Sequence, residues 1–199
     1  MDILYRIGKL EDSLKIAEGI DRASGGIVEF LFHGLLGSYT AAQVMAKSLQ
    51  EKQGSDSYEN AIVAEYQGNI IGVVYSYPAK FHGITEDTRS FFPSDRLALL
   101  GDFYNSRVEN SWFLDSIFVD KDFRGEGIGS KLIELTKQKA RDNGYDQLSL
   151  MVMADNNVAR RTYERNNFKI FKHIEIQEHE LIPHKGGVYL LVSNLNDEL

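Results

Sequence analysis

The chain has 199 residues, of which 43% are hydrophobic, and a net charge of −7 from 22 Lys and Arg against 29 Asp and Glu. A chain of this length can bury roughly 70% of its unfolded surface, so we expect a single domain over residues 1–199. The negative charge argues against broad nucleic-acid or anionic-membrane binding, and the lack of cysteine excludes a disulfide, a thiolate nucleophile and a Cys-ligated metal.

The N-terminal stretch MDILYRIGKLED carries five charged side chains and therefore lacks the unbroken apolar run of a signal peptide. Nowhere does the sequence hold 18 consecutive apolar residues, the length that suggests a membrane-spanning helix. These features predict a cytoplasmic protein with no membrane partner and no nucleic-acid partner.

The first quarter of the chain is predicted to be helical. Residues 10–52 show helical periodicity, with interruptions near Ser24–Gly26 and near His33–Ser38. After them, residues 61–66 and 70–77 resemble the two strands of a hairpin around a Gly-Asn turn.

Residues 78–110 have no clear periodicity and mix aromatic with charged residues around one short helical patch over 94–103. The second half alternates strands and helices more clearly. Its predicted elements are a strand over 111–119, a helix ending near Arg141 with Gly144 just beyond it, a strand over 147–153, a helix over 156–166, and two antiparallel strands over 168–177 and 186–195. This order indicates an α/β or α+β fold with a mixed sheet.

Three glycines, Gly125, Gly127 and Gly129, follow Arg124 at the start of the helix that ends near Arg141. Backbone amides at a helix N-terminus lack partners and carry partial positive charge, and glycine lets a phosphate approach them closely. A single Gly-x-Gly would more simply be a tight turn, but three glycines beside an arginine favour an anion site. The spacing matches neither G-x-x-x-x-G-K-[ST] nor G-x-G-x-x-G.

The stretch RGEGIG fits R/Q-x-x-G-x-G/A, the acyl-CoA signature of the GCN5-related N-acetyltransferase (GNAT) superfamily. Asn156, Ala159, Tyr163 and Phe168 fit the second signature of that family, N-x-x-A-x-x-x-Y-x-x-x-(G)-F, with Asn167 in place of the usual glycine. Asparagine tolerates left-handed backbone angles, so we expect the turn to be kept. The chain resembles the family over about residues 60–192.

The resemblance implies the acyl-CoA N-acyltransferase fold: a mixed, mostly antiparallel sheet of six or seven strands with helices on both faces. One parallel pair, 112–119 beside 147–153, would splay and leave a wedge for acetyl-CoA. The residues implied to bind the co-substrate are Ile117, Phe118 and Val119 at the pantetheine arm, Arg124, Gly125, Glu126, Gly127, Ile128, Gly129 and Ser130 at the pyrophosphate, and Asn156, Ala159 and Tyr163 on the following helix.

Two catalytic roles follow from the same resemblance. Tyr163 would protonate the departing thiolate, although without the motif it would be read as a core aromatic residue. The backbone N–H of residue 118 or 119 would stabilise the carbonyl oxygen. A carboxylate must also take a proton from the acceptor amine, and Asp115 is the first candidate. Glu109, Asp102, His82 and a water molecule remain alternatives, and no cluster suggests a metal.

Acceptor specificity would come from three segments, about residues 20–40, 78–110 and 178–187. Aromatic residues there, with the carboxylates nearby, suit a small cationic amine, although a peptide acceptor stays open. His179 and His184 are interpreted as surface residues. The leading hypothesis is an acetyl-CoA-dependent N-acetyltransferase. Members of the family that it resembles are often homodimers, so a homodimer is a further expectation. A non-catalytic CoA-binding sensor or assembly module and a nucleotide-binding protein are the alternatives.

Overall fold

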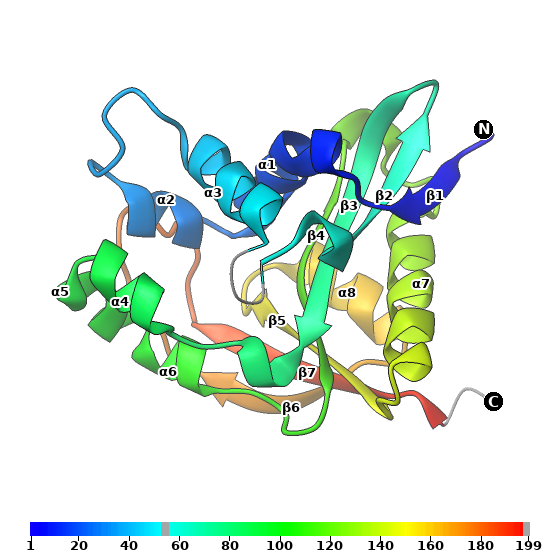
Figure 1. Ribbon diagram of the computed structural model, residues 1–199. Helices are drawn as coiled ribbons and strands as arrows, with labels where there is room; N and C mark the ends of the chain where they lie inside the picture. The colour runs from blue at the N-terminus through cyan, green and yellow to red at the C-terminus, as the bar shows by residue number, and fades with distance from the viewer. Residues whose placement is uncertain (53–55, 197–199) are drawn as a thin grey trace.

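The computed structural model describes residues 1–52 and 56–196. Figure 1 shows a central sheet flanked by helices. The strands are β1 (Leu4–Ile7), β2 (Ala61–Tyr66), β3 (Asn69–Pro78), β4 (Trp112–Val119), β5 (Gln147–Met153), β6 (Lys169–Ile174) and β7 (Val188–Asn194). The helices are α1 (Ser13–Ala23), α2 (Ile27–Phe32), α3 (Ala41–Glu51), α4 (Glu86–Phe91), α5 (Ser94–Leu99), α6 (Gly101–Asn105), α7 (Ile128–Asp142) and α8 (Asn157–Arg165).

The seven strands form one sheet in the order β1-β2-β3-β4-β5-β7-β6. Every neighbouring pair is antiparallel except β4 and β5, which are parallel. The predicted fold class, a mixed and mostly antiparallel sheet of six or seven strands with a single parallel pair, is therefore confirmed.

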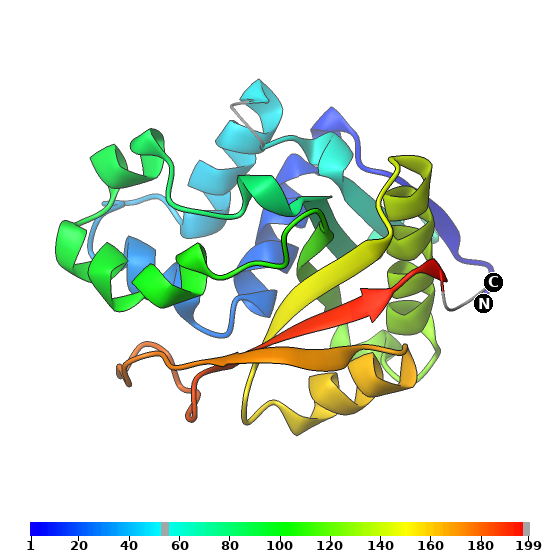
Figure 2. The ribbon, with the colours of Figure 1, turned by 90° about the horizontal axis from the view of Figure 1, so that it is seen from below.

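Helices cover both faces of this sheet, as predicted (Figure 2). Side chains alternate between the two faces of a strand, so neighbouring residues of β2 join different cores. Ile62 and Ala64 pack with the core that contains Leu132 and Ile133 of α7. Ala61 and Val63 pack instead with the core that α1 and α3 supply.

The structure interrupts the N-terminal helical region at both of the predicted places. The helix α1 ends at Ala23, and α2 ends at Phe32. A capping box then begins α3, because the Thr40 hydroxyl accepts from the Gln43 N–H and the Gln43 side chain accepts from the Thr40 N–H.

Three elements differ from the sequence-based expectation. The edge strand β1 was not predicted, because it is only four residues long and lacks a clear apolar alternation. The segment 78–110 contains three short helices rather than one patch, and Leu100 separates α5 from α6. The strand predicted over 168–177 ends at Ile174, and β7 begins only at Val188, after two glycines with positive φ.

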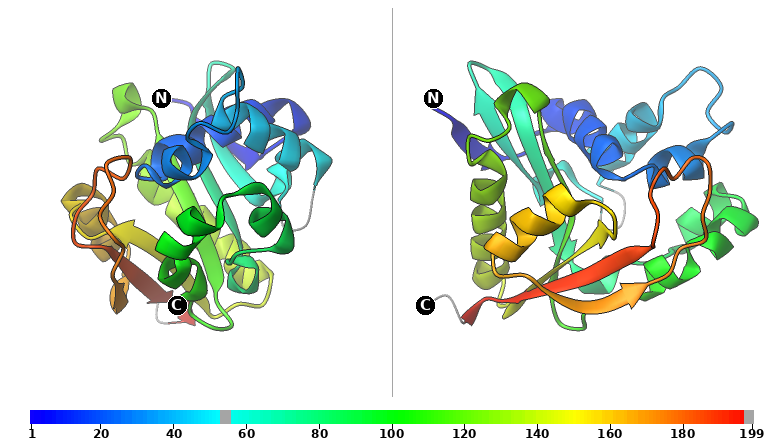
Figure 3. Two further views of the ribbon diagram at one scale, coloured as in Figure 1. Left: turned by 90° about the vertical axis from the view of Figure 1, so that its left-hand side faces the viewer. Right: turned by 180° about the vertical axis from the view of Figure 1, so that it is seen from behind.

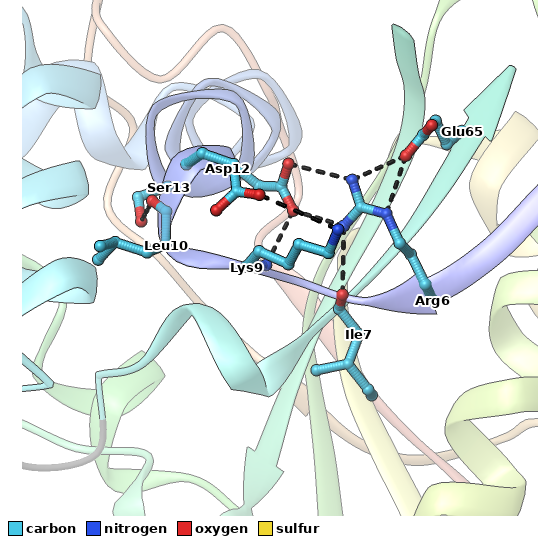
Figure 4. A network of polar contacts seen from close by, with 8 residues as sticks. Arg6, Ile7, Lys9, Leu10, Asp12, Ser13 and Glu65 are labelled. Atoms are coloured by element: carbon cyan, nitrogen blue, oxygen red, sulfur yellow. Dashed lines mark hydrogen bonds and ion pairs between the residues drawn. The ribbon is translucent and has the colours of Figure 1, made fainter. Parts of the chain in front are cut away.

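A polar network secures β1 to the rest of the molecule (Figure 4). The Arg6 guanidinium donates to both carboxylate oxygens of Asp12 and to Glu65 of β2. Burial alone would raise the pKa of Asp12, but the hydrogen bonds from Arg6 and from the Lys9 N–H outweigh it and hold that pKa below its ordinary value. The network therefore stabilises the fold most when Asp12 is ionised.

Replacing Arg6 by methionine is expected to lower the free energy of unfolding by about 2 kcal/mol at pH 7, because it leaves the buried Asp12 carboxylate without its charged donor. A folded-state pKa below the unfolded one contributes stability above the unfolded pKa, and that contribution is lost as pH falls through the folded pKa. The difference between wild type and Arg6→Met in urea denaturation should therefore shrink below about pH 4. The exposed Lys15–Glu18 pair provides the control: Lys15→Met should change stability by less than about 0.5 kcal/mol.

Candidate active site

The strands β4 and β5 pair along only part of their length. Residues 112–114 pair with residues 148–150, although β4 continues to Val119 and β5 to Met153. Beyond Leu114 the two parallel strands therefore separate, and the edge of β4 that faces β5 has no strand partner. This is the splayed pair that the sequence predicted.

A β-bulge on β4 accounts for the separation. In the pairing with β3, Tyr75 is opposite Ser116, but the next residue, Ser76, is opposite Leu114. Asp115 is therefore the extra residue of the bulge. A bulge bends its strand and increases the local twist, which turns the rest of β4 away from β5.

The main-chain groups of Ile117 and Val119 point into the gap between the strands. The Asp120 N–H donates to the carbonyl of Ile71 on β3 at 2.8 Å. The N–H and C=O groups of successive residues point alternately to the two sides of a strand. Phe118, like Asp120, therefore turns its N–H and C=O toward β3, whereas Ile117 and Val119 turn theirs the other way. Of the two positions considered for the carbonyl-stabilising N–H, residue 119 thus faces the gap and residue 118 does not.

The glycine-rich loop lies between β4 and α7. Gly125 and Gly127 have φ values of +89° and +79°, a region that side-chain-bearing residues avoid, and Gly127 is the N-cap of α7. Two of the three glycines therefore lie outside the helix, and only Gly129 carries the cost of a glycine within it. A Cβ at Gly125 or Gly127 would meet no atom within 4 Å, so the loop faces open space.

Arg124 connects this loop to the gap, because its Nε donates to the Val119 carbonyl at 3.0 Å. The first backbone hydrogen bond of α7 runs from the Lys131 N–H to the Gly127 carbonyl. The N–H groups of residues 128–130 thus precede the helical ladder and are suited to bind an anion. Ser130 lies beside α8, where its hydroxyl accepts from the Asn166 side chain at 3.4 Å.

The helix α8 carries the second signature. Asn156 is its N-cap, and its side-chain oxygen accepts from the Ala159 N–H at 3.1 Å, which leaves the side-chain NH₂ as a possible donor to a ligand. Tyr163 is buried and packs edge-to-face against Phe168. Burial raises the pKa of Tyr163, so its hydroxyl keeps its proton across the working pH range. Asn167 has a φ of +63°, the left-handed angle expected of it.

Asp115, at the bulge, lies among aromatic side chains. Its Oδ1 accepts from the Tyr77 hydroxyl at 2.8 Å, and its Oδ2 accepts from the Ser116 hydroxyl at 2.8 Å. Burial, and then the Asp115 charge, raise the pKa values of Tyr77 and Tyr104. The bulge thus holds one carboxylate, with both oxygens hydrogen-bonded, at the point where β4 leaves β5.

The other candidate bases lie in different surroundings. Glu109 is exposed and forms an ion pair with Arg107 at 2.8 Å, and Asp102 is exposed on α6. His82 is only 3% exposed, and burial lowers its pKa despite the nearby Asp115 charge. Its Nε2 lies 3.2 Å from the Phe103 carbonyl, and its ring stacks on Tyr104. This packing is typical of a core histidine.

One functional candidate escaped the sequence analysis. Asp56, just before the 3₁₀ turn Tyr58–Asn60, lies close enough to Asp115 for the two carboxylate charges to repel. The residue is exposed to solvent, yet the protein atoms around its carboxylate remove much of the hydration of that group. This desolvation, and then the Asp115 charge, raise the pKa of Asp56 to about 6. Its 59-residue separation from Asp115 hides this proximity in the sequence.

The three segments predicted to shape the acceptor site share one apolar core. Ile27, Phe30 and Leu31 of α2 pack with Leu97 and Leu100 from the α5 region, and with Ile182 from the loop between β6 and β7. Figure 3 shows that loop beside α2. The Leu181 backbone leaves no room for a Cβ at Gly26, so this contact requires glycine.

The same loop is anchored next to α8. His184 Nδ1 lies 2.6 Å from Asp155 Oδ1, and the Lys185 N–H donates to Asp155 Oδ2 at 2.9 Å. Because Asp155 precedes Asn156, this loop is connected directly to the N-cap of α8. His179 packs its ring on Phe30, so neither histidine is a simple surface residue.

Two further observations concern residues 1–52 and 56–196. No three His, Asp or Glu side chains gather there as a metal site would require. None of the helices in this part of the chain combines the length and the apolar character needed to span a bilayer.

Comparisons with known proteins agree with this geometry. A family model described as "Acetyltransferase (GNAT) family" matches residues 31–168, more than half of the chain. Thialysine N-epsilon-acetyltransferase of Bos taurus is 40% identical over 61 residues, a match that covers 31% of this chain and only 36% of that relative.

Solved structures are similar over nearly the whole chain. The crystal structure of an acetyltransferase, 25% identical, covers 96% of this chain and 99% of its own with a TM-score of 0.69. An N-acetyltransferase from Staphylococcus aureus Mu50, 18% identical, covers 95% and 99%, also with a TM-score of 0.69. PaiA N-acetyltransferase from Thermoplasma acidophilum in complex with coenzyme A, 14% identical, covers 98% and 99% with a TM-score of 0.55. The chain belongs to the GNAT family of acetyltransferases.

Proposed function

We propose that the protein transfers the acetyl group of acetyl-CoA directly to a primary amine of a small, cationic acceptor. The observation that carries this proposal is the bulge at Asp115, because it joins two features. It opens the edge of β4 toward the glycine-rich loop, and it sets a carboxylate at the start of the opening.

The residues present fit acetyl-CoA. The N–H groups that precede the ladder of α7, with Arg124 beside them, suit a pyrophosphate. The N–H and C=O groups of Ile117 and Val119 suit the amide groups of a pantetheine arm, and Asn156 can donate a further hydrogen bond. When bound, acetyl-CoA supplies the activated thioester.

Groups of the protein itself would then promote the transfer of the acetyl group. A main-chain N–H of β4, from Ile117 or Val119, would donate to the carbonyl oxygen as negative charge develops on it. The buried Tyr163 hydroxyl, which is protonated at neutral pH, would donate its proton to the departing sulfur. The lack of cysteine supports direct attack by the amine, since no thiolate can hold the acetyl group in between.

The acidic and aromatic surroundings of Asp115 support a cationic acceptor. An ammonium group is attracted both by carboxylates and by the faces of aromatic rings such as Tyr75, Tyr77 and Tyr104. The Bos taurus relative is named for an ε-amine acceptor, which agrees with an aliphatic amine.

Release of free thiol from acetyl-CoA should be measured with thialysine, lysine, polyamines, aminoglycosides and short peptides as acceptors. We expect release with one class of small cationic amine, and less release with peptides. Tight CoA binding with no thiol release from any acceptor would instead support a CoA-binding sensor. Displacement of CoA by ATP at similar concentrations would support a nucleotide-binding protein.

A further inference from the structure

We propose that Asp56 is the general base that takes the proton from the acceptor ammonium, and that Asp115 acts as a fixed counter-charge beside it. This inference rests on the proposed function and assigns a step within it. It gives the base role to a residue outside the two family signatures and outside β4.

The hydrogen bonds of Asp115 limit it as a base. Each of its oxygens accepts from a side-chain hydroxyl at 2.8 Å, one from Tyr77 and the other from Ser116. Both carboxylate oxygens are thus already engaged by donors of the protein itself. These donors also fix the orientation of the carboxylate, which suits a group that holds a positive charge in place.

The position of Asp56 brings it to the same side of the sheet as Asp115. The next residue, Ser57, donates its N–H to the Tyr75 hydroxyl at 3.2 Å, and the Tyr75 ring packs against Tyr77 at 5.8 Å between centroids. Tyr77 in turn donates to Asp115. This chain of contacts runs from the segment before β2, across β3, to the bulge of β4.

Asp56 differs from Asp115 in what its carboxylate contacts. Among the residues that the structure describes, none donates a hydrogen bond to Asp56, and the residue is exposed to solvent. A ligand ammonium can therefore approach it directly. The titratable groups that face it are Asp115 of β4 and Tyr75 of β3.

The acidity of Asp56 suits this role. A general base is most effective when its pKa lies near the working pH, because it is then ionised and still holds a proton well. Desolvation, with the repulsion from Asp115, raises the pKa of Asp56 to about 6. At pH 7 most of the protein would thus hold Asp56 as a carboxylate that is more basic than an ordinary aspartate.

The protons balance in this scheme. The overall reaction converts R–NH₃⁺ and acetyl-CoA into R–NH–acetyl, CoA–SH and one free proton. Asp56 takes the first proton of the ammonium and passes it to solvent; the nitrogen then forms the N–C bond as the C–S bond breaks. Tyr163 gives its proton to the sulfur, and the second proton lost by nitrogen restores Tyr163 through solvent.

A ¹³C NMR titration of the aspartate carboxyl carbons tests the acidity of Asp56 without any acceptor. Asp56→Asn identifies the resonance by its loss, and Asp56 is exposed, so this variant should fold as wild type. We expect a pKa near 6, which should fall in Asp115→Asn because the repelling charge is gone. A pKa near 4 in wild type would overturn the assignment.

The pH dependence of kcat/KM for an active amine tests the role itself, because this quantity reports the acidity of the free enzyme. Wild-type kcat/KM should rise with pH through about 6, and Asp56→Asn should lose this limb and about 100-fold in kcat at pH 7. Asp142→Asn, which removes an exposed carboxylate that accepts from the Gln138 side chain at the end of α7, is the matched control and should behave as wild type. An Asp56→Asn enzyme with unchanged kcat and a raised KM would overturn the base role. An inert amine panel would count against the proposed function instead.

Discussion

A Gly127→Glu variant is expected to lose CoA binding, with affinity reduced on the order of 100-fold or more, measured by isothermal titration calorimetry. Gly127 is the N-cap of α7, and its Cβ position faces open space. A glutamate there would extend in front of the amides that suit the pyrophosphate, and it would add a negative charge to a site for an anion. The open space gives the new side chain room, so the backbone strain of a positive φ is the cost that remains.

Gly144 provides the matched control for this variant. It lies at the other end of α7 with the same φ of +79°, and a Cβ there would also meet nothing within 4 Å. Gly144→Glu therefore carries the same backbone strain, of about 1–2 kcal/mol, without a change near the loop. It should bind CoA as wild type does. Equal binding by the two glutamate variants would contradict the placement of the pyrophosphate.

Removal of the Tyr163 hydroxyl is expected to have the second large effect. Tyr163→Phe should lower kcat by about 100-fold, because the thiolate then departs without a proton donor. The affinity for CoA should stay within a factor of two, since the phenylalanine ring can keep the packing on Phe168. Thiol release and calorimetry on the same preparation separate the two quantities.

Tyr145→Phe serves as the control for Tyr163→Phe. Tyr145 packs edge-to-face on Trp112 beyond the C-terminus of α7, and its hydroxyl has no part in the proposed chemistry. This variant should keep wild-type kcat. An unchanged kcat in Tyr163→Phe would mean that another group or water protonates the thiolate, and Tyr163 would then be a core aromatic residue only.

The features predicted well from sequence are those that a short local pattern encodes. The glycines at 125 and 127 take positive φ angles, and Asn167 takes the left-handed angle that its replacement of glycine required. The two apolar runs around a Gly-Asn turn likewise located the hairpin of β2 and β3. Each of these depends on the conformation of a few consecutive residues.

The features missed depend on contacts between distant segments. The short strand β1 is fixed by Arg6, which bridges Asp12 and Glu65, rather than by an apolar pattern. The bulge at Asp115 exists only in the register of β4 against β3, and the repulsion between the charges of Asp115 and Asp56 joins segments that are far apart in the sequence. Sequence spacing could therefore name Asp115 as a candidate base but could not find its neighbour.

The most direct test of the proposed function follows the acetyl group itself. Labelled acetyl-CoA should be incubated with the protein and an active small amine, and mass spectrometry should locate the label in a single turnover. We expect it on the nitrogen of the amine, with no acetylated intermediate on the protein. Label that stays on CoA with every amine, despite tight CoA binding, would contradict the assignment of this protein as a small-amine N-acetyltransferase.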